Sequence, residues 1–304
     1  MKSFLGAIFV ALAAILWATD NLVRYPDSTV IDLRLIVFSE HLLAVVFFLP
    51  IVFLKGGVRL FRLSLKEWLG VAVLGVGGAA LATVFYSWSV LQLGVSLPML
   101  IQKFQPFIVV VLAYFVLRER PKLNFFPWTI LAILCAMLIG FPATGFRTFS
   151  DGSLSSFTGF LAAFSAMVLW ALSTVYGKFL LNRLSVEQVT FLRFAAGSVA
   201  LGVLVVATDA RNGFGVMFSQ FSFNHILSFA YLSLVPGLFA FWLYYKGLQR
   251  IPASIATFVE LLFPLAGIVL NVAFGLASIT FFQATVGLLL LFSVLLIAIP
   301  RTRH

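Results

Sequence analysis

The chain has 304 residues, of which 62% are hydrophobic and only 10% charged, and its mean hydropathy is +1.12. Soluble domains are about 45–50% apolar and about 25% charged, so this composition excludes both a water-soluble globule and a disordered chain. The net charge of +10 would suit nucleic-acid binding in a soluble protein, but membrane proteins carry excess Lys and Arg in their cytoplasmic loops whatever they do, so no nucleic-acid partner is expected.

Ten hydrophobic stretches, each bounded by charged or turn residues, follow one another along the chain. They lie at about 4–23, 32–54, 68–91, 95–117, 125–142, 157–180, 188–207, 226–246, 252–274 and 281–299. A membrane-spanning helix needs about 20 apolar residues, so each stretch predicts one such helix. The predicted fold class is an all-α integral membrane protein with ten transmembrane helices in the lipid bilayer.

The basic residues between these stretches predict the orientation in the membrane. If alternate loops lie on opposite sides, fourteen basic residues fall on one side: Lys2, Lys55, Arg59, Arg62, Lys66, Arg118, Arg120, Lys122, Lys178, Arg183, Lys246, Arg250, Arg301 and Arg303. The other side has Arg24, Arg34, Arg147 and Arg211. Because positive loops stay in the cytoplasm, both termini are expected there, in a multi-pass protein of the inner (plasma) membrane.

The chain contains an internal repeat. A shift of 153 residues lays Leu16-Trp-Ala18 on Leu169-Trp-Ala171, and a shift of 158 lays Tyr86, Ser96 and Pro106 on Tyr244, Ser254 and Pro264. These matches predict two five-helix halves, residues 1–145 and 157–304, joined near 146–156. The first stretch also has features of a cleavable signal peptide, but its recurrence in the repeat favours an integral helix.

An odd number of helices in each half gives the two halves opposite orientations in the membrane. Such inverted-topology repeats are typical of secondary transporters, because they provide inward-open and outward-open arrangements around one site near the bilayer midplane. Gene duplication alone would leave the same pattern in a protein without transport activity.

The motifs of this chain resemble those of the drug/metabolite transporter superfamily, specifically its EamA-type ten-helix exporters. In the first half, the resemblance rests on Leu16-Trp-Ala18, on Ile101-Gln-Lys-Phe-Gln-Pro106 and on Leu117-Arg-Glu-Arg120. The last of these is similar to the family's Leu-Gly-Glu-Arg. In the second half, it rests on Leu169-Trp-Ala171, on Ile251-Pro-Ala-Ser254 and on Val259-Glu-Leu-Leu-Phe-Pro264. It implies export of a small organic molecule. Two departures are that Phe274-Gly-Leu-Ala-Ser278 lacks the acid of its first-half counterpart, and that Glu40 stands where family members often carry arginine.

Ionisable and polar residues inside the predicted spans are the candidate site. Charges in a span are costly unless they face a protein interior or water, so they mark functional positions. The candidates are Glu40, His41, Gln102, Lys103 and Gln105 toward the outside, and Arg193 and Glu260 toward the cytoplasm. We expect Glu40 to face Lys103, and Arg193 to face Glu260, either as gates and substrate contacts or, alternatively, as static ion pairs.

Repeat-related aromatic residues complete the candidate site: Trp17, Tyr86, Trp170 and Tyr244. Aromatic walls suit apolar or cationic groups of a substrate, although most rings in a chain with 16% aromatic residues face lipid or the core. His41 and Glu260 are candidates for proton uptake, while His41 alternatively serves as a hydrogen-bonding core residue. Pro106 and Pro264 predict kinks directly after the polar clusters.

The predicted function is secondary active transport of a small organic metabolite by alternating access. The mixed charges inside the spans, with aromatic residues nearby, favour a zwitterion such as an amino acid, including an aromatic one, and the family resemblance implies export. Alternatives are drug-like cations, vitamins or nucleobases and, in another class, a lipid-flipping or non-catalytic membrane subunit. No nucleotide-binding loop and no cluster of metal ligands is visible, so we expect neither an enzyme nor a cofactor or bound metal. The sequence leaves the direction of transport, the coupling to protons and the oligomeric state open.

Overall fold

A computed structural model describes residues 2–20, 22–24, 31–54, 62–94, 96–121, 125–140, 154–209, 222–275 and 278–298. Helices are the only regular secondary structure in these residues, which confirms the all-α fold class. The predicted junction between the halves lies almost entirely outside the described residues, as do several of the loop charges used to assign the orientation.

Each of the ten predicted stretches corresponds to one helix or one consecutive group of helices, some of which extend a few residues beyond the predicted ends. The first five hold α1 (Lys2–Ala18), α3 (Leu33–Leu54), α4 with η2 and α5 (Leu65–Val71, Ala72–Leu81, Ala82–Leu93), α6 with α7 (Ser96–Gln102, Gln105–Val116) and α8 (Phe126–Gly140). The second five hold α9 (Leu154–Leu181), α10 (Val186–Asp209), α12 with η6 and α13 (Phe223–Leu232, Ser233–Phe239, Ala240–Arg250), α14 with α15 (Ala253–Val259, Leu262–Ala273) and α16 (Phe281–Ala298).

The lengths of these helices fit a protein that crosses a membrane many times. Within the described residues, nine helical segments are long and apolar enough to span a bilayer, and a tenth apolar helix, Phe126–Ile139, is shorter. One span, Ser3–Arg24, extends past the end of its predicted stretch and includes Arg24, which belongs to the site described below.

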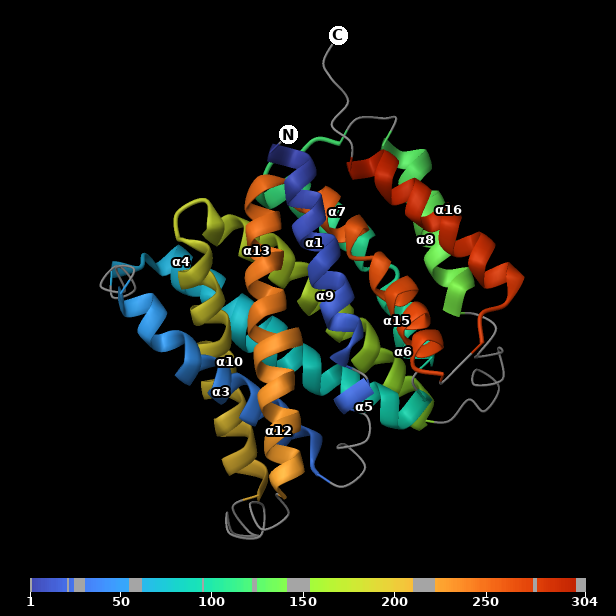
Figure 1. The fold of residues 1–304 in the computed structure, drawn as a ribbon. Coiled ribbons are helices and arrows are strands. Elements are labelled where there is room, and N and C mark those ends of the chain that lie inside the picture. Colours follow the sequence, from blue (N-terminus) through green and yellow to red (C-terminus); the bar gives the residue numbers. More distant parts are fainter. Residues whose placement is uncertain are drawn as a thin grey trace.

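The helices pack in pairs that are distant in the sequence (Figure 1). α1 lies against α13, α3 against α10, α5 against α9, and α8 against α16. α8 and α16 form a separate pair at one side of the bundle, and the start of α1 lies at the same end of the molecule as the end of α16. This placement of the start of α1 and the end of α16 agrees with an even number of membrane crossings.

Two segments of π-helix lie within long spans. η2 is preceded by α4 and followed by α5, and η6 lies between α12 and α13. Under the shift of 158 residues, η2 corresponds to residues 230–239 and therefore overlaps η6. Small residues allow η2 to approach its neighbours, because a Cβ atom at Gly75 would overlap Ala196 and one at Gly78 would overlap Ser173. π-helical turns inside α-helices frequently mark functional sites.

Two spans are interrupted near their middle, as the prolines predict. α6 ends at Gln102 and α7 begins at Gln105, while α14 ends at Val259 and α15 begins at Leu262. Pro106 and Pro264 each lack the N–H that would bond the carbonyl four residues earlier, which belongs to Gln102 or Glu260. The interruptions therefore occur at the two polar clusters singled out in the sequence.

Arg118, which follows α7, has a backbone conformation that suits glycine. Its φ is 57°, in the left-handed region that costs residues other than glycine about 1–2 kcal/mol, and its side chain is exposed. Replacing Arg118 with Gly is therefore expected to raise the free energy of unfolding by about 1 kcal/mol. Thermal unfolding of the purified protein in detergent measures this, and Arg120→Gly in the same loop is the matched control, expected to give no gain. A lower unfolding temperature for Arg118→Gly than for the unmodified chain would contradict the argument.

Candidate functional site

A cavity of about 330 Å³ lies between the helices. Small-molecule sites usually have volumes of about 300–1,000 Å³, so it is large enough for a metabolite. Every predicted site residue except Tyr86 lines it, namely Trp17, Glu40, His41, Gln102, Lys103, Gln105, Trp170, Arg193, Tyr244 and Glu260. The paired helices α8 and α16 contribute none of its described lining residues. The cavity thus belongs to the other eight spans.

Arg24 connects two acidic side chains at one end of the cavity. Its Nη2 donates to Asp20 Oδ2 at 2.6 Å and to Glu40 Oε1 at 2.7 Å. Glu40 is buried, with 6% of its surface exposed, so this ion pair compensates a charge that would otherwise be costly. The prediction that Glu40 faces Lys103 is therefore wrong, since the base that pairs with Glu40 is Arg24.

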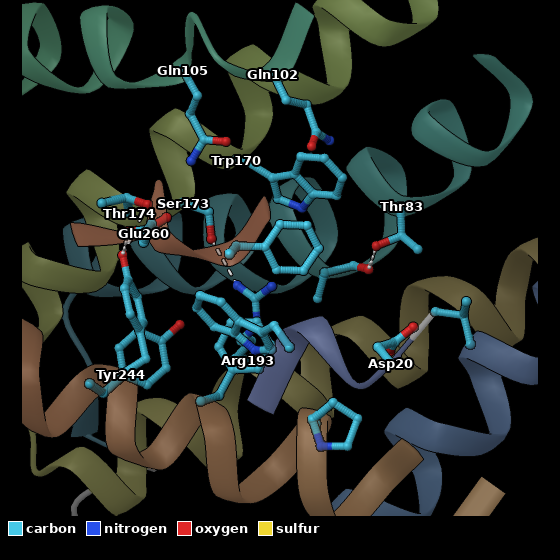
Figure 2. A pocket seen from close by; sticks show the side chains of 18 of the residues that line it. Asp20, Thr83, Gln102, Gln105, Trp170, Ser173, Thr174, Arg193, Tyr244 and Glu260 are labelled. Carbon is cyan, nitrogen blue, oxygen red and sulfur yellow. Dashed lines mark hydrogen bonds between the residues drawn. The ribbon is translucent and has the colours of Figure 1, made fainter. Parts of the chain in front are cut away.

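Lys103 lies at the interruption between α6 and α7. It is buried, and its ammonium nitrogen is 5.8 Å from the centre of the Phe263 ring. Among the described residues no carboxylate lies within 4.0 Å of it. The side chains of Gln102 and Gln105 extend from the same region of the cavity wall (Figure 2). This end of the cavity therefore offers a cation and two amides to a ligand.

Arg193 enters the cavity from α10 and has neutral partners. Its Nη1 donates to Ser173 Oγ at 2.9 Å, a contact drawn in Figure 2, and its guanidinium carbon is 4.0 Å from the centre of the Phe241 ring. This cation–π contact and the hydroxyl stabilise a buried charge. The predicted pair with Glu260 is wrong, because these two side chains form no ion pair among the interactions of the described residues.

Glu260 lies at the other interruption, between α14 and α15. Its Oε1 accepts a hydrogen bond from the Tyr244 hydroxyl at 2.8 Å, and the same hydroxyl is 3.2 Å from Thr174 Oγ1 (Figure 2). No basic side chain within the described residues pairs with Glu260. A carboxylate held only by a hydroxyl remains able to bind a positive group or a proton donor.

His41 resembles a structural residue more than a free titrating one. Its Nδ1 lies 2.8 Å from the carbonyl oxygen of Val37, and because a carbonyl only accepts, Nδ1 donates in this bond. The ring is 5.1 Å from the ring of Phe194. The alternative interpretation from the sequence, a hydrogen-bonding core histidine beside the cavity, matches these contacts.

Aromatic rings form much of the apolar wall. The ring of Trp17 is 5.0 Å from Phe241 and 5.2 Å from Tyr244, and Trp170 donates from Nε1 to the carbonyl oxygen of Gly78 at 2.9 Å. Tyr86 packs on the ring of Trp170 at 5.4 Å but does not line the cavity. The predicted role of Tyr86 as a lining residue is therefore corrected to support of Trp170.

Several buried polar atoms in the cavity wall have no partner among the described residues. They are Trp17 Nε1, Arg24 Nη1, Arg193 Nε and the Thr257 hydroxyl. Three of the four are N–H groups that only donate. Because an unsatisfied buried donor is costly, this arrangement favours a ligand rich in hydrogen-bond acceptors.

Arg24, Phe241 and Thr257 are among the lining residues that the sequence interpretation missed. Arg24 was assigned to an outer loop, although it lies four residues after Asp20 and thus on the same helix face. Phe241 lies three residues before Tyr244, which also places the two rings on one face. Thr257 carried no detectable signal.

Comparisons with known proteins agree on the kind of protein. The profile of the EamA-like transporter family matches residues 4–141 and 157–299. The chain is 30% identical, over 272 residues, to the riboflavin transporter ImpX of Fusobacterium nucleatum subsp. nucleatum, an alignment that covers 88% of each chain.

A solved structure described as a crystal structure of a protein has a similar fold. Its TM-score is 0.76 over 95% of this chain and 94% of the other, with 18% sequence identity. At this identity the likeness concerns the fold alone.

Proposed function

This chain belongs to the EamA-like transporter family and is a multi-pass membrane transporter, and from this premise we propose that it moves a small organic metabolite by secondary active transport with alternating access. The observation that carries the proposal is a cavity bounded by interrupted helices and lined with polar and aromatic side chains. Transporters of this kind bind their substrates at such interruptions, where unwound backbone faces a cavity rather than lipid.

We propose that residues 1–145 and 157–304 are inverted repeats, and that their exchange of conformation opens the cavity to each side in turn. Equivalent features in the two halves support this proposal: the overlapping π-helical segments η2 and η6, and the interruptions that precede Pro106 and Pro264. The charge distribution supports a location in the inner membrane with both termini in the cytoplasm.

As the substrate class we propose planar aromatic heterocycles that carry several hydrogen-bond acceptors, with riboflavin as the first candidate. An isoalloxazine ring would stack on aromatic walls such as Trp17 and Phe241, and its carbonyl oxygens and ring nitrogens would accept from donors such as Arg193 Nε. The similarity to a riboflavin transporter supports the same class.

An amino acid is the second candidate, because Lys103 and Glu260 both line the cavity and neither has an ionic partner among the described residues. The ammonium of Lys103 would bind the carboxylate of a zwitterion, and the carboxylate of Glu260 would bind its ammonium. Export is the direction that the family resemblance favours, although the same cycle runs either way with the gradients.

Counterflow in proteoliposomes distinguishes these substrates. Vesicles loaded with unlabelled riboflavin are expected to accumulate labelled riboflavin, with competition by isoalloxazines that lack the sugar-like chain and none by amino acids. Tyr244→Phe, which removes the hydroxyl bonded to Glu260, is expected to slow this exchange several-fold, while Tyr86→Phe, outside the cavity, serves as the matched control. Exchange of a labelled amino acid and not of riboflavin would favour the second candidate, and exchange of neither would overturn both.

Protons are the coupling ion that we propose, with Glu260 as the carrying group, because its described partner is a hydroxyl rather than a cation. The same proteoliposomes test this with an imposed pH gradient. Uptake that is equal with and without the gradient would exclude proton coupling.

A further inference from the structure

Glu119 follows the left-handed turn at the end of α7 and reaches the beginning of α14. Its Oε1 accepts from the backbone N–H of Ala253 at 2.8 Å, and its Oε2 accepts from the backbone N–H of Ser254 at 3.0 Å and from the Ser254 hydroxyl at 2.6 Å. One carboxylate thus receives three hydrogen bonds from the start of one helix. Charge-assisted bonds of this kind are among the strongest in proteins.

Lys178, near the end of α9, holds the same turn from its other side. Its ammonium nitrogen donates to the carbonyl oxygens of Leu248 at 2.6 Å, Ile251 at 2.9 Å and Gln249 at 3.3 Å. In the turn that joins α13 to α14, the Glu119 carboxylate therefore binds backbone N–H groups and the Lys178 ammonium binds backbone carbonyls. We call Glu119 and Lys178, with the turn 248–254 that they bind, the turn clamp.

The turn clamp lies at a tightly packed end of the bundle. A side chain at Gly6 in α1 would overlap Ile251 and Arg250, and one at Gly247 in α13 would overlap the backbone of Gly6. α1 begins at this end, which the charge distribution assigns to the cytoplasm. Thr257, which lines the cavity, is about one helical turn beyond Ser254 along α14. The turn clamp therefore lies about one helical turn from the cavity, at the end of the bundle where α1 begins.

The opposite end has no equivalent of the turn clamp in its sequence. The shift of 158 residues places Ala277 at the position of Glu119, and the shift of 153 places Tyr25 at the position of Lys178. Neither an alanine nor a tyrosine side chain replaces the charge of its counterpart. Both residues lie outside the described part of the chain.

We propose that the turn clamp is a gate lock that holds the cavity closed on the side of the α1 start, and that its release is required for the transporter to open there. Because a lock stabilises the state in which its own side is closed, it biases the resting population toward that state. The inference rests on the alternating access of the proposed function, and it gives Glu119 a role as a positioning residue that never contacts substrate.

Access to a reporter cysteine in the cavity tests the lock without using a substrate. In a Cys135→Ala background, Thr257→Cys is exposed to a membrane-impermeant methanethiosulfonate from either side of membrane vesicles. Glu119→Ala is expected to increase the labelling rate at least about tenfold from the side of the α1 start and to leave the rate from the other side unchanged or lower. Arg120→Ala, one residue along the same loop, is the matched control and is expected to change neither rate.

Lys178→Met removes the other half of the turn clamp and is expected to give the same one-sided increase. Equal labelling rates in Glu119→Ala and Arg120→Ala would overturn the proposal. An equal increase from both sides would also overturn it, because that result indicates general loosening of the fold. Labelling requires no transport, so a failure of the proposed substrate class appears in counterflow alone and is distinguishable from a failure of the lock.

Discussion

Arg193→Met is expected to weaken substrate binding by about 10- to 100-fold. A buried hydrogen bond to a charged group is worth about 1.5–3 kcal/mol, and each 1.4 kcal/mol corresponds to a factor of ten in affinity. Arg193 lines the cavity with a free Nε, while its Nη1 is held 2.9 Å from Ser173 Oγ and its guanidinium lies on the Phe241 ring. Methionine keeps most of the aliphatic part of the arginine side chain, so the expected loss of affinity comes from the missing guanidinium group and its polar contacts. The KM for counterflow of the labelled substrate measures the effect.

Two further variants separate the roles of Arg193. Arg193→Lys keeps the charge but lacks the planar fork and the Nε donor, so it is expected to recover only part of the affinity. Ser173→Ala removes a hydrogen-bond partner of Arg193 but keeps the unpartnered Nε donor of Arg193. We therefore expect the KM to change threefold or less. If Arg193→Met lowered the unfolding temperature but left the KM unchanged, Arg193 would be a structural cation and not a substrate contact.

The ten helices could be predicted because apolar stretches of about 20 residues have few alternatives to spanning a bilayer. The interruptions at Pro106 and Pro264 could be predicted as well, since a proline removes a helix hydrogen bond wherever it lies. The lining residues followed from the cost of placing polar groups such as Lys103 or Glu260 in lipid. These predictions depend only on residue type and position along one helix.

The contacts between helices could not be predicted in this way. A helix that is apolar on all sides gives no signal for which face points inward, so depth alone paired Glu40 with Lys103 and Arg193 with Glu260. In the structure, Glu40 pairs with Arg24. Ser173 is the neutral partner of Arg193, and Tyr244 is the neutral partner of Glu260.

Tyr86 shows the effect of local helix geometry on the same kind of prediction. The π-helical segments that precede these two tyrosines differ in length, since η2 has 10 residues and η6 has 7. The repeat places Tyr86 opposite Tyr244 in the sequence, yet only Tyr244 reaches the cavity.

Arg24 was misassigned for another reason, because a basic residue at the end of an apolar stretch fits both a loop and a helix end. The helical span includes Arg24, and its spacing of four residues from Asp20 brings both side chains to the face near Glu40. An orientation argument that assigns every terminal Arg to a loop therefore hides one of the cavity's charges.

The pair of Arg24 and Glu40 carries the largest expected effect on stability. Arg24→Met would leave Glu40 as a buried carboxylate without its cation, and breaking a buried ion pair in this way costs about 3–5 kcal/mol. The double variant Arg24→Met with Glu40→Gln removes the uncompensated charge and is expected to recover most of that loss. Asp20, the other partner of Arg24, is partly exposed and keeps access to water.

Thermal unfolding in detergent, analysed as a double-mutant cycle, measures the coupling between these two residues. Arg34→Met is the matched control, because Arg34 and Asp32 form an exposed pair whose loss is expected to cost about 1 kcal/mol or less. If the double variant were less stable than Arg24→Met alone, Glu40 would be stabilised by something other than Arg24. Recovery of stability without recovery of transport would instead show that the transport cycle needs the charges themselves, because the rescued protein is folded and still inactive.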